Sequence, residues 1–189
     1  MCNVARRQQL AVHMDGACLM NAVVATNVTA REFAACVDSV WIDFTKGLGA
    51  PVGAVLAGTR AFIEEARRYK HIFGGALRQA GIVAAGCLYA PDHHIERLHE
   101  DHLNAQRLAA GLGIVPGIFV RTPVPESNMV FFDVSGTGLE TPVFLAQMHE
   151  RGVKMSSVRG EVRAVTHLDV SQQDIDTALE VITDLTYNN

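Results

Sequence analysis

The order of apolar and polar positions over residues 9–58 predicts a strand–helix–strand unit followed by a strand that turns back. Such a unit implies parallel strands joined by a right-handed crossover. Thr29 is expected to cap a second helix, because Glu32 stands three residues later, as in a capping box. Strands are expected at residues 9–14, 40–44 and 52–58, and the first helix at 19–25.

The next part of the chain is typical of helices. Residues 59–69 have an amphipathic pattern, with apolar residues on one side and mostly charged residues on the other. A second helix, expected at 79–89, is rich in alanine and glycine, so we expect it to be buried by close packing. Pro91 is expected to break or kink the chain before a third helix at about 93–110.

Beyond Gly111 short apolar runs alternate with helical patterns, which is typical of a small α+β lobe. We therefore expect two domains, at residues 1–111 and 112–189. Strands are expected at 118–121, 129–134, 152–155 and 162–166, and helices at 141–151 and 173–185.

Composition narrows the class of protein. The content of hydrophobic residues, 49%, is typical of a globular chain, and no apolar run reaches membrane-spanning length. The first ten residues lack the apolar core of a signal peptide, so we expect a cytoplasmic protein with no membrane partner. A net charge of −4 argues against a nucleic-acid partner. The four cysteines form no C-x-x-C pair and are typical of unpaired thiols in a reducing compartment.

The first candidate for chemistry is Lys46, which follows an expected strand and precedes a turn rich in glycine. Glycines after a strand end let the backbone approach a ligand closely, and a lysine held there can form a Schiff base with an aldehyde. An ordinary surface lysine is the simpler interpretation of Lys46 alone. Asp15, however, ends the neighbouring parallel strand, at the same edge of the sheet. Pyridoxal phosphate needs such a pair, a lysine for its aldehyde and an acid for its ring nitrogen.

Several segments extend this interpretation over nearly the whole chain. They are residues 13–17 (HMDGA), 45–53 (TKGLGAPVG), 74–81 (GGALRQAG), 101–105 (DHLNA) and 162–170 (VRAVTHLDV). Together and in this order they resemble the low-specificity L-threonine aldolases, which are fold-type-I pyridoxal phosphate-dependent enzymes. The resemblance implies an α/β fold: part of the large domain of a fold-type-I transferase, followed by a small α+β C-terminal lobe.

The resemblance also implies roles for individual residues. Lys46 would form the Schiff base with pyridoxal phosphate, and Asp15 would bond its ring nitrogen. Thr45 stands where the family has a serine and would keep the same hydroxyl chemistry. Arg163 would bind the substrate carboxylate with its planar guanidinium. Arg78 matches an arginine that reaches the cofactor phosphate from a neighbouring subunit, which implies a homodimer or homotetramer.

The implied activity is retro-aldol cleavage of L-threonine, L-allo-threonine or a related β-hydroxy amino acid to glycine and an aldehyde. No residue of this chain is identified as the catalytic base. Two alternatives stay open. One is another fold-type-I lyase, β-eliminating or similar to serine hydroxymethyltransferase, and the other is a non-catalytic remnant that self-associates or pairs with a longer homologue.

The chain departs from the family pattern at two positions and in length. Cys18 stands where the family has an arginine, and a small packing role is the favoured interpretation of this thiol. His71 stands where a lysine is usual. Family members are about twice as long, and the match begins within their large domain, so we expect a truncated aldolase that is inactive, or nearly so, by itself.

Four histidines invite a metal hypothesis, namely His93, His94, His99 and His102. A polar helix face explains them more simply, because they lack an accompanying carboxylate pattern with metal-ligand spacing. We therefore expect no metal site. His167 belongs to the Arg163 segment and is expected to order the strand near the site.

Overall fold

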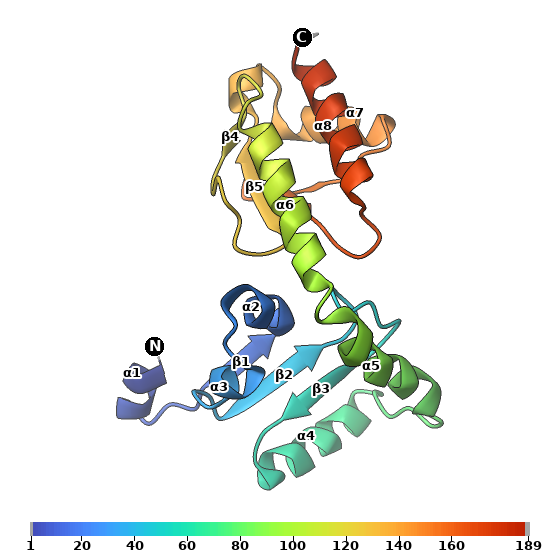
Figure 1. Ribbon diagram of the computed structural model, residues 1–189. Helices are drawn as coiled ribbons and strands as arrows, with labels where there is room; N and C mark the ends of the chain where they lie inside the picture. Colours follow the sequence, from blue (N-terminus) through green and yellow to red (C-terminus); the bar gives the residue numbers. More distant parts are fainter. Residues whose placement is uncertain (1, 188–189) are drawn as a thin grey trace. The chain divides into compact units, whose positions relative to one another are not determined.

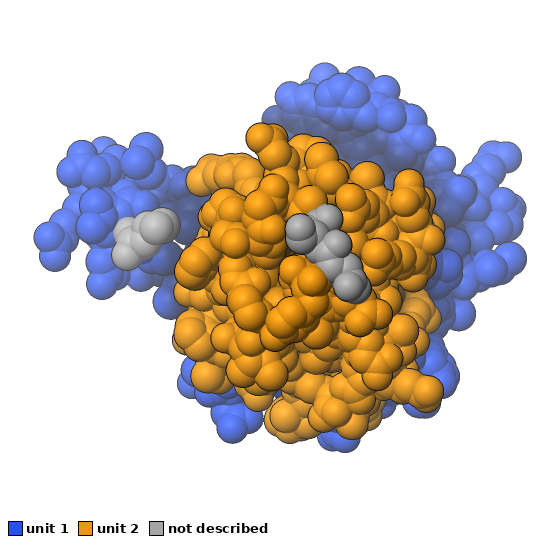
Figure 2. Space-filling model, turned by 90° about the horizontal axis from the view of Figure 1, so that it is seen from above, with its two compact units in different colours: residues 1–97 blue, residues 98–189 orange. Residues whose placement is uncertain are grey.

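The computed structural model describes residues 2–187, and the chain divides into two compact units, residues 1–97 and 98–189 (Figure 2). Each unit has its own sheet and is described by itself. Among the described residues, no helix combines the length and the apolar character needed to cross a membrane.

The N-terminal unit is built on a three-stranded sheet in the order β1-β2-β3 (Figure 1). β1 (His13–Gly16) and β2 (Ser39–Asp43) are parallel, and β3 (Ala54–Ala57) returns antiparallel to β2. The helices α2 (Leu19–Thr26) and α3 (Ala30–Ala34) connect the two parallel strands. The predicted strand–helix–strand unit and the returning strand are therefore confirmed. The first strand, however, begins at His13 rather than at residue 9, because residues 9–12 form a turn and loop.

Local signals in the sequence explain where these helices begin. Thr29 caps α3 with a full capping box, since its hydroxyl accepts from the Glu32 amide and the Glu32 carboxylate accepts from the Thr29 amide. Hydrogen bonding to Thr29 lowers the pKa of Glu32 below its usual value. Thr59 caps the amphipathic helix α4 (Arg60–Ile72) in a similar way, by accepting from the amide of Phe62.

Two predictions about the following helices were wrong. The small-residue helix α5 (Gly81–His94) buries only Ala90 among its residues, although we expected a buried helix. Its small residues permit close packing, but within this chain they meet few neighbours. The helix does not end near residue 89 but continues through Pro91 to His94, so Pro91 does not break it, whereas a kink at Pro91 stays a prediction. A short N-terminal helix, α1 (Cys2–Arg7), was not predicted.

The buried apolar side chains of the N-terminal unit are few: Leu19, Val40, Leu48, Ala50 and Ala90. Two of them, Leu48 and Ala50, belong to the turn that follows Lys46. The turn that carries the candidate lysine therefore contributes two of these five buried side chains.

The C-terminal unit is a four-stranded antiparallel sheet in the order β4-β5-β7-β6, with helices α6, α7 and α8 (Figure 1). Alternate residues of β5 and β7 are buried, which is typical of a sheet covered on one face. The elements are α6 (Leu98–Leu112), β4 (Phe119–Val120), β5 (Met129–Asp133), a 3-10 helix η1 (Ser135–Thr137), α7 (Thr141–Glu150), β6 (Ser156–Val158), β7 (Glu161–Val165) and α8 (Gln172–Tyr187).

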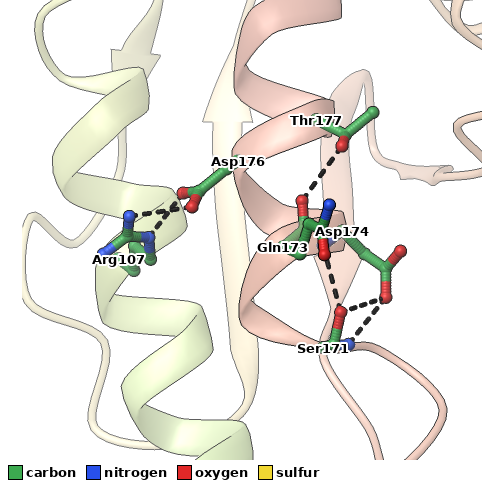
Figure 3. Close-up of polar contacts among 6 residues, drawn as sticks. All are labelled: Arg107, Ser171, Gln173, Asp174, Asp176 and Thr177. Carbon is green, nitrogen blue, oxygen red and sulfur yellow. Dashed lines mark hydrogen bonds and ion pairs between the residues drawn. The ribbon is translucent and has the colours of Figure 1, made fainter.

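This unit has a continuous hydrophobic core. Phe132 of β5 and Phe144 of α7 are fully buried and meet edge to face, with ring centroids 6.2 Å apart. At the surface, Arg107 of α6 forms a bidentate ion pair with Asp176 of α8 at 2.6 and 2.9 Å (Figure 3). The covered face and the paired helices explain why the α+β pattern of the sequence gives a closed unit.

Two predicted boundaries need correction. α6 belongs to the C-terminal unit, because Ala105, Leu108 and Leu112 are buried in its core, so the unit begins at Leu98 rather than at 112. The strand expected at 152–155 is a turn and loop, and the strand itself starts at Ser156. Gly152 adopts a φ of 85°, which is a turn conformation rather than an extended one.

Candidate functional site

Asp15 and Lys46 lie on one face of the N-terminal sheet, at the carboxyl ends of β1 and β2. Asp15 is the register neighbour of Trp41, and neighbours on adjacent parallel strands project to the same face. The Lys46 ammonium lies over the Trp41 ring, 5.9 Å from its centroid. Both candidate side chains are exposed, so a ligand has access to them from this face.

The close pairing of these two strands depends on Gly16. A Cβ at this position would come within 2.2 Å of the Trp41 carbonyl oxygen, so the backbones could not approach as they do. The Asp15 carboxylate accepts a hydrogen bond from the Ala17 amide at 3.0 Å, which fixes the carboxylate at the strand end. The Asp-Gly sequence thus sets both the strand spacing and the orientation of the acid.

Backbone hydrogen bonds form the turn around Lys46. The Gly49 amide donates to the Lys46 carbonyl at 2.9 Å, and the Ala50 amide donates to the Phe44 carbonyl at 2.7 Å. Gly49 has a φ of 68°, in the left-handed region where glycine is favoured. This turn fixes the backbone that carries the lysine.

Helix α5 forms hydrogen bonds to the backbone of this turn. His94 donates from Nδ1 to the Leu48 carbonyl at 2.5 Å, and the Cys87 thiol donates to the Val52 carbonyl at 3.2 Å. Gly53 lies against Cys87 so closely that a Cβ there would be 2.2 Å from the sulfur. Although α5 is largely exposed, it therefore has a defined part in positioning the candidate lysine.

Thr45, an expected cofactor-binding residue, donates its hydrogen bonds to Asp43. Its hydroxyl lies 2.8 and 2.9 Å from the two carboxylate oxygens of Asp43, and its amide donates to Oδ1 at 3.1 Å. Asp43 is only 8% exposed. The sequence did not indicate this residue, because an aspartate at the end of an apolar strand run gives no separate signal.

Arg163 lies on β7, on the sheet face opposite the hydrophobic core, since its neighbours Val162 and Ala164 are the buried ones. Its cross-strand partners are Ser156 on β6 and Phe131 on β5. The guanidinium Nε donates to the Ser156 hydroxyl at 3.2 Å. Both terminal nitrogens then remain for a carboxylate, a geometry that the sequence did not predict because Ser156 lies outside the recognised segments.

The structure does not bring Arg78 to the other candidates. It lies exposed in the turn before α5, and none of the contacts described for residues 2–187 joins it to Asp15 or Lys46. His71 also makes a local hydrogen bond, from its Nδ1 to the Arg67 carbonyl at 2.7 Å, one turn earlier in α4. The expected contact of Arg78 with the cofactor phosphate of a neighbouring subunit therefore stays a prediction.

Two smaller interpretations also need revision. Cys18 is exposed just before α2, so it is not the buried packing thiol that we favoured. His102 is buried at 4% exposure rather than on a polar helix face, and this burial lowers its pKa, more than the neighbouring Asp101 raises it. Within residues 2–187, no three histidine, cysteine, aspartate or glutamate side chains form a group that could hold a metal ion. His167 lies beyond the end of β7 and contacts Asp169.

Comparison with protein families gives a match to the family described as beta-eliminating lyase, over residues 1–135. Among curated proteins, the chain is 35% identical over 180 residues to low-specificity L-threonine aldolase 1 of Arabidopsis thaliana and 38% identical over 170 residues to the low specificity L-threonine aldolase of Escherichia coli strain K12. These alignments cover 93% and 90% of this chain. They cover 50% and 49% of the relatives, so the chain spans about half the length of the curated relatives it matches.

Solved structures give the same picture. A protein from Exiguobacterium sp. 255-15, named an aromatic amino acid beta-eliminating lyase/threonine aldolase, matches with a TM-score of 0.77 at 26% identity. The match covers 97% of this chain and 55% of that one. An L-allo-threonine aldolase from Listeria monocytogenes EGD-E matches with a TM-score of 0.74 at 23% identity, which shows the shared fold. The expected fold class is therefore confirmed, as is the resemblance to threonine aldolases.

Proposed function

Because the chain belongs to the beta-eliminating lyase family, we propose that it serves a pyridoxal phosphate-dependent aldehyde-lyase reaction. The reaction is cleavage of L-threonine, L-allo-threonine or a related β-hydroxy amino acid to glycine and an aldehyde. The names of the relatives support this substrate class. The observation that carries the proposal is the placement of Asp15 and Lys46 on one face, at the ends of adjacent parallel strands.

The residues present fit the cofactor in two of its three parts. An exposed lysine amine suits the aldehyde, and the Asp15 carboxylate suits a protonated ring nitrogen. The phosphate is the part that does not yet fit, because both donors of Thr45 are engaged by Asp43. Bound in this way, pyridoxal phosphate would supply an electron sink for the Cα–Cβ bond that breaks.

Each side chain has a definite task in this proposal. The Lys46 amine would bind the cofactor aldehyde and would hold a proton near the reacting carbon. The Asp15 carboxylate keeps the ring nitrogen protonated by its negative charge. Arg163 binds the substrate carboxylate through its terminal nitrogens, with Nε held by Ser156.

The assembly is also part of the proposal. We place the protein in the cytoplasm, in amino acid metabolism between threonine breakdown and glycine formation, as a homodimer or homotetramer. In that assembly Arg78 would approach the phosphate of a neighbouring subunit. Since the chain spans half the length of its relatives, we expect the isolated chain to bind the cofactor weakly and to show little or no lyase activity alone.

The direct test is to incubate the purified chain with pyridoxal phosphate, reduce it with borohydride and map the adduct by peptide mass. We expect an adduct at Lys46, abolished in Lys46→Ala and reduced in Asp15→Asn. Lys70 and Lys154, which are exposed and lie outside the site, serve as internal controls for random labelling. Equal labelling of all three lysines would contradict the proposal.

A second candidate function follows from the family description and from the name of the Exiguobacterium structure, which both include β-elimination. Product analysis separates the two reactions. Glycine and an aldehyde from threonine support the aldolase, whereas ammonia and a 2-oxo acid support elimination. The non-catalytic remnant would give neither product and no Lys46 adduct.

A further inference from the structure

Thr45 has no hydrogen-bond donor left for a phosphate. A threonine offers one backbone N–H and one hydroxyl proton. In this chain both point to the carboxylate of Asp43, at 3.1 Å for the amide and at 2.8 and 2.9 Å for the hydroxyl. An anion at this position would find only the hydroxyl lone pairs, which cannot bond it.

The charge of Asp43 adds to this effect. The residue is buried at 8% exposure, so solvent screens its carboxylate poorly. Among residues 2–187 its carboxylate accepts hydrogen bonds from Thr45 alone and forms no ion pair with a cationic side chain. A phosphate beside Thr45 would therefore face an uncompensated negative charge.

The neighbouring lysine is not affected in the same way. Lys46 points to the exposed face near Trp41, where an uncharged aldehyde carries no charge for Asp43 to repel. In a phosphorylated aldehyde, the aldehyde group can thus reach Lys46, whereas the phosphate group would be repelled beside Thr45.

We propose that Asp43 is a specificity-determining residue that disfavours phosphate at the Lys46 turn, by withholding the donors of Thr45 and by direct repulsion. The inference rests on the proposed function for the role of Lys46, but the effect on phosphate is separate from it. At this turn pyridoxal phosphate therefore binds with little more affinity than pyridoxal, which lacks the phosphate, as long as Asp43 keeps its charge.

The first experiment measures trapped adduct at Lys46 with pyridoxal phosphate and with pyridoxal, and compares the two apparent affinities. In Asp43→Ala the ratio in favour of the phosphate compound is expected to rise at least about tenfold, as for a recovered hydrogen bond to a charged group. Asp43→Asn keeps an acceptor for Thr45 while removing the charge, and gives a smaller rise. Asp38→Asn is the matched control, because it removes one charge at the opposite end of β2 and leaves the ratio unchanged.

A double substitution tests the route through Thr45. If the freed donors bind the phosphate, adding Thr45→Val to Asp43→Ala removes most of the gain, whereas Thr45→Val in the wild-type background lowers the ratio far less. An unchanged ratio in both Asp43 variants would overturn the proposal.

The second experiment does not depend on Lys46. The amide of Thr45 in the 15N-labelled full chain is followed by NMR during titration with inorganic phosphate. We expect no saturable shift in the wild type and a saturable shift in Asp43→Ala, with retained dispersion of the other amides showing that the variant is folded. A saturable shift in the wild type, or none in folded Asp43→Ala, would contradict the inference. Absence of any pyridoxal adduct at Lys46 would instead count against the proposed function.

Discussion

The two units of this chain differ in how far each completes its own core. In the C-terminal unit Phe132, Phe144, Met148 and Ile182 are fully buried. In the N-terminal unit every residue of β3 is exposed, and large apolar side chains such as those of Phe73 and Ile82 are 83% and 85% exposed. One unit can be stabilised by its own packing, whereas the other carries the candidate lysine on a sheet with two unpaired edges.

The contrast between the two units shows that the candidate site is ordered by contacts close to the Lys46 turn. The N-terminal unit buries few apolar side chains, but two of them, Leu48 and Ala50, belong to the Lys46 turn and are 3% and 6% exposed. α5 adds hydrogen bonds from Cys87 and His94 to the same turn. The lysine is thus placed by a local framework rather than by a large core.

The largest effect on stability is expected in the C-terminal unit, which has the better packed core. Phe132→Ala should destabilise the C-terminal unit by about 3–5 kcal/mol, because it leaves a cavity beside Phe144. Val55→Ala in β3 is the matched change in the N-terminal unit, where the side chain is 52% exposed, and should change stability by less than about 1 kcal/mol. Urea unfolding followed by circular dichroism measures both, and similar losses in the two variants would contradict the contrast.

A second prediction concerns the framework under the lysine. Gly53→Ala should destabilise the Lys46 turn by about 1–3 kcal/mol, because the new Cβ overlaps Cys87 and the φ of 140° disfavours a side chain. Gly81→Ala is the control, since a Cβ at that helical position meets nothing within 4 Å. Trapping of pyridoxal at Lys46 should fall in the first variant only. If both variants label like the wild type, α5 does not position the turn.

The third prediction is a pH dependence confined to the C-terminal unit. Burial lowers the pKa of His102 below its ordinary value of 6.5. As pH falls below about 6.5, the unfolded chain takes up a proton that the folded chain does not, so the free energy of unfolding decreases until the lower, folded-state pKa is reached. The urea concentration at the unfolding midpoint should therefore decrease as the pH is lowered from 7 to 5.5. This decrease should be smaller in His102→Gln. An equal slope in that variant would show that other groups cause it.

The smallest effects are expected at two capped helices. Ser171→Ala should lower the stability of the C-terminal unit by about 1 kcal/mol, because Ser171 accepts from the Asp174 amide and donates to its carboxylate at the start of α8 (Figure 3). Thr29→Ala removes the equivalent cap of α3, a helix with no buried residue, and should shift overall unfolding less. Equal shifts in thermal midpoint would argue against the difference in core packing between the units.

The sequence predicted most elements because their signals are local. The capping box at Thr29, the strand before Lys46 and the alternation around Phe132 each depend on neighbours within a few residues. Burial of α5 could not be predicted, since a row of small residues shows that a helix can pack closely but not that a partner is present. The boundary near 111 was misplaced for a similar reason, as the packing of α6 depends on residues far along the chain.

The sequence predicted where some candidate residues lie in the sheet, but it did not predict the hydrogen bonds that they make. Asp15 and Lys46 follow from strand ends and a glycine turn, so their shared edge was predictable. The engagement of Thr45 by Asp43 and of Arg163 by Ser156 was not, because each depends on a turn or a strand register that composition does not specify. The roles of all five predicted site residues stay predictions, namely those of Asp15, Thr45, Lys46, Arg78 and Arg163.

Hydrogen exchange of the full chain, followed by mass spectrometry, tests the contrast between the units most directly. We expect slow exchange in β5, β7 and α8, fast exchange in β3 and α4, and intermediate protection confined to the Lys46 turn within the N-terminal unit. Equal protection across both units would contradict it, as would a Lys46 turn that exchanges as fast as β3.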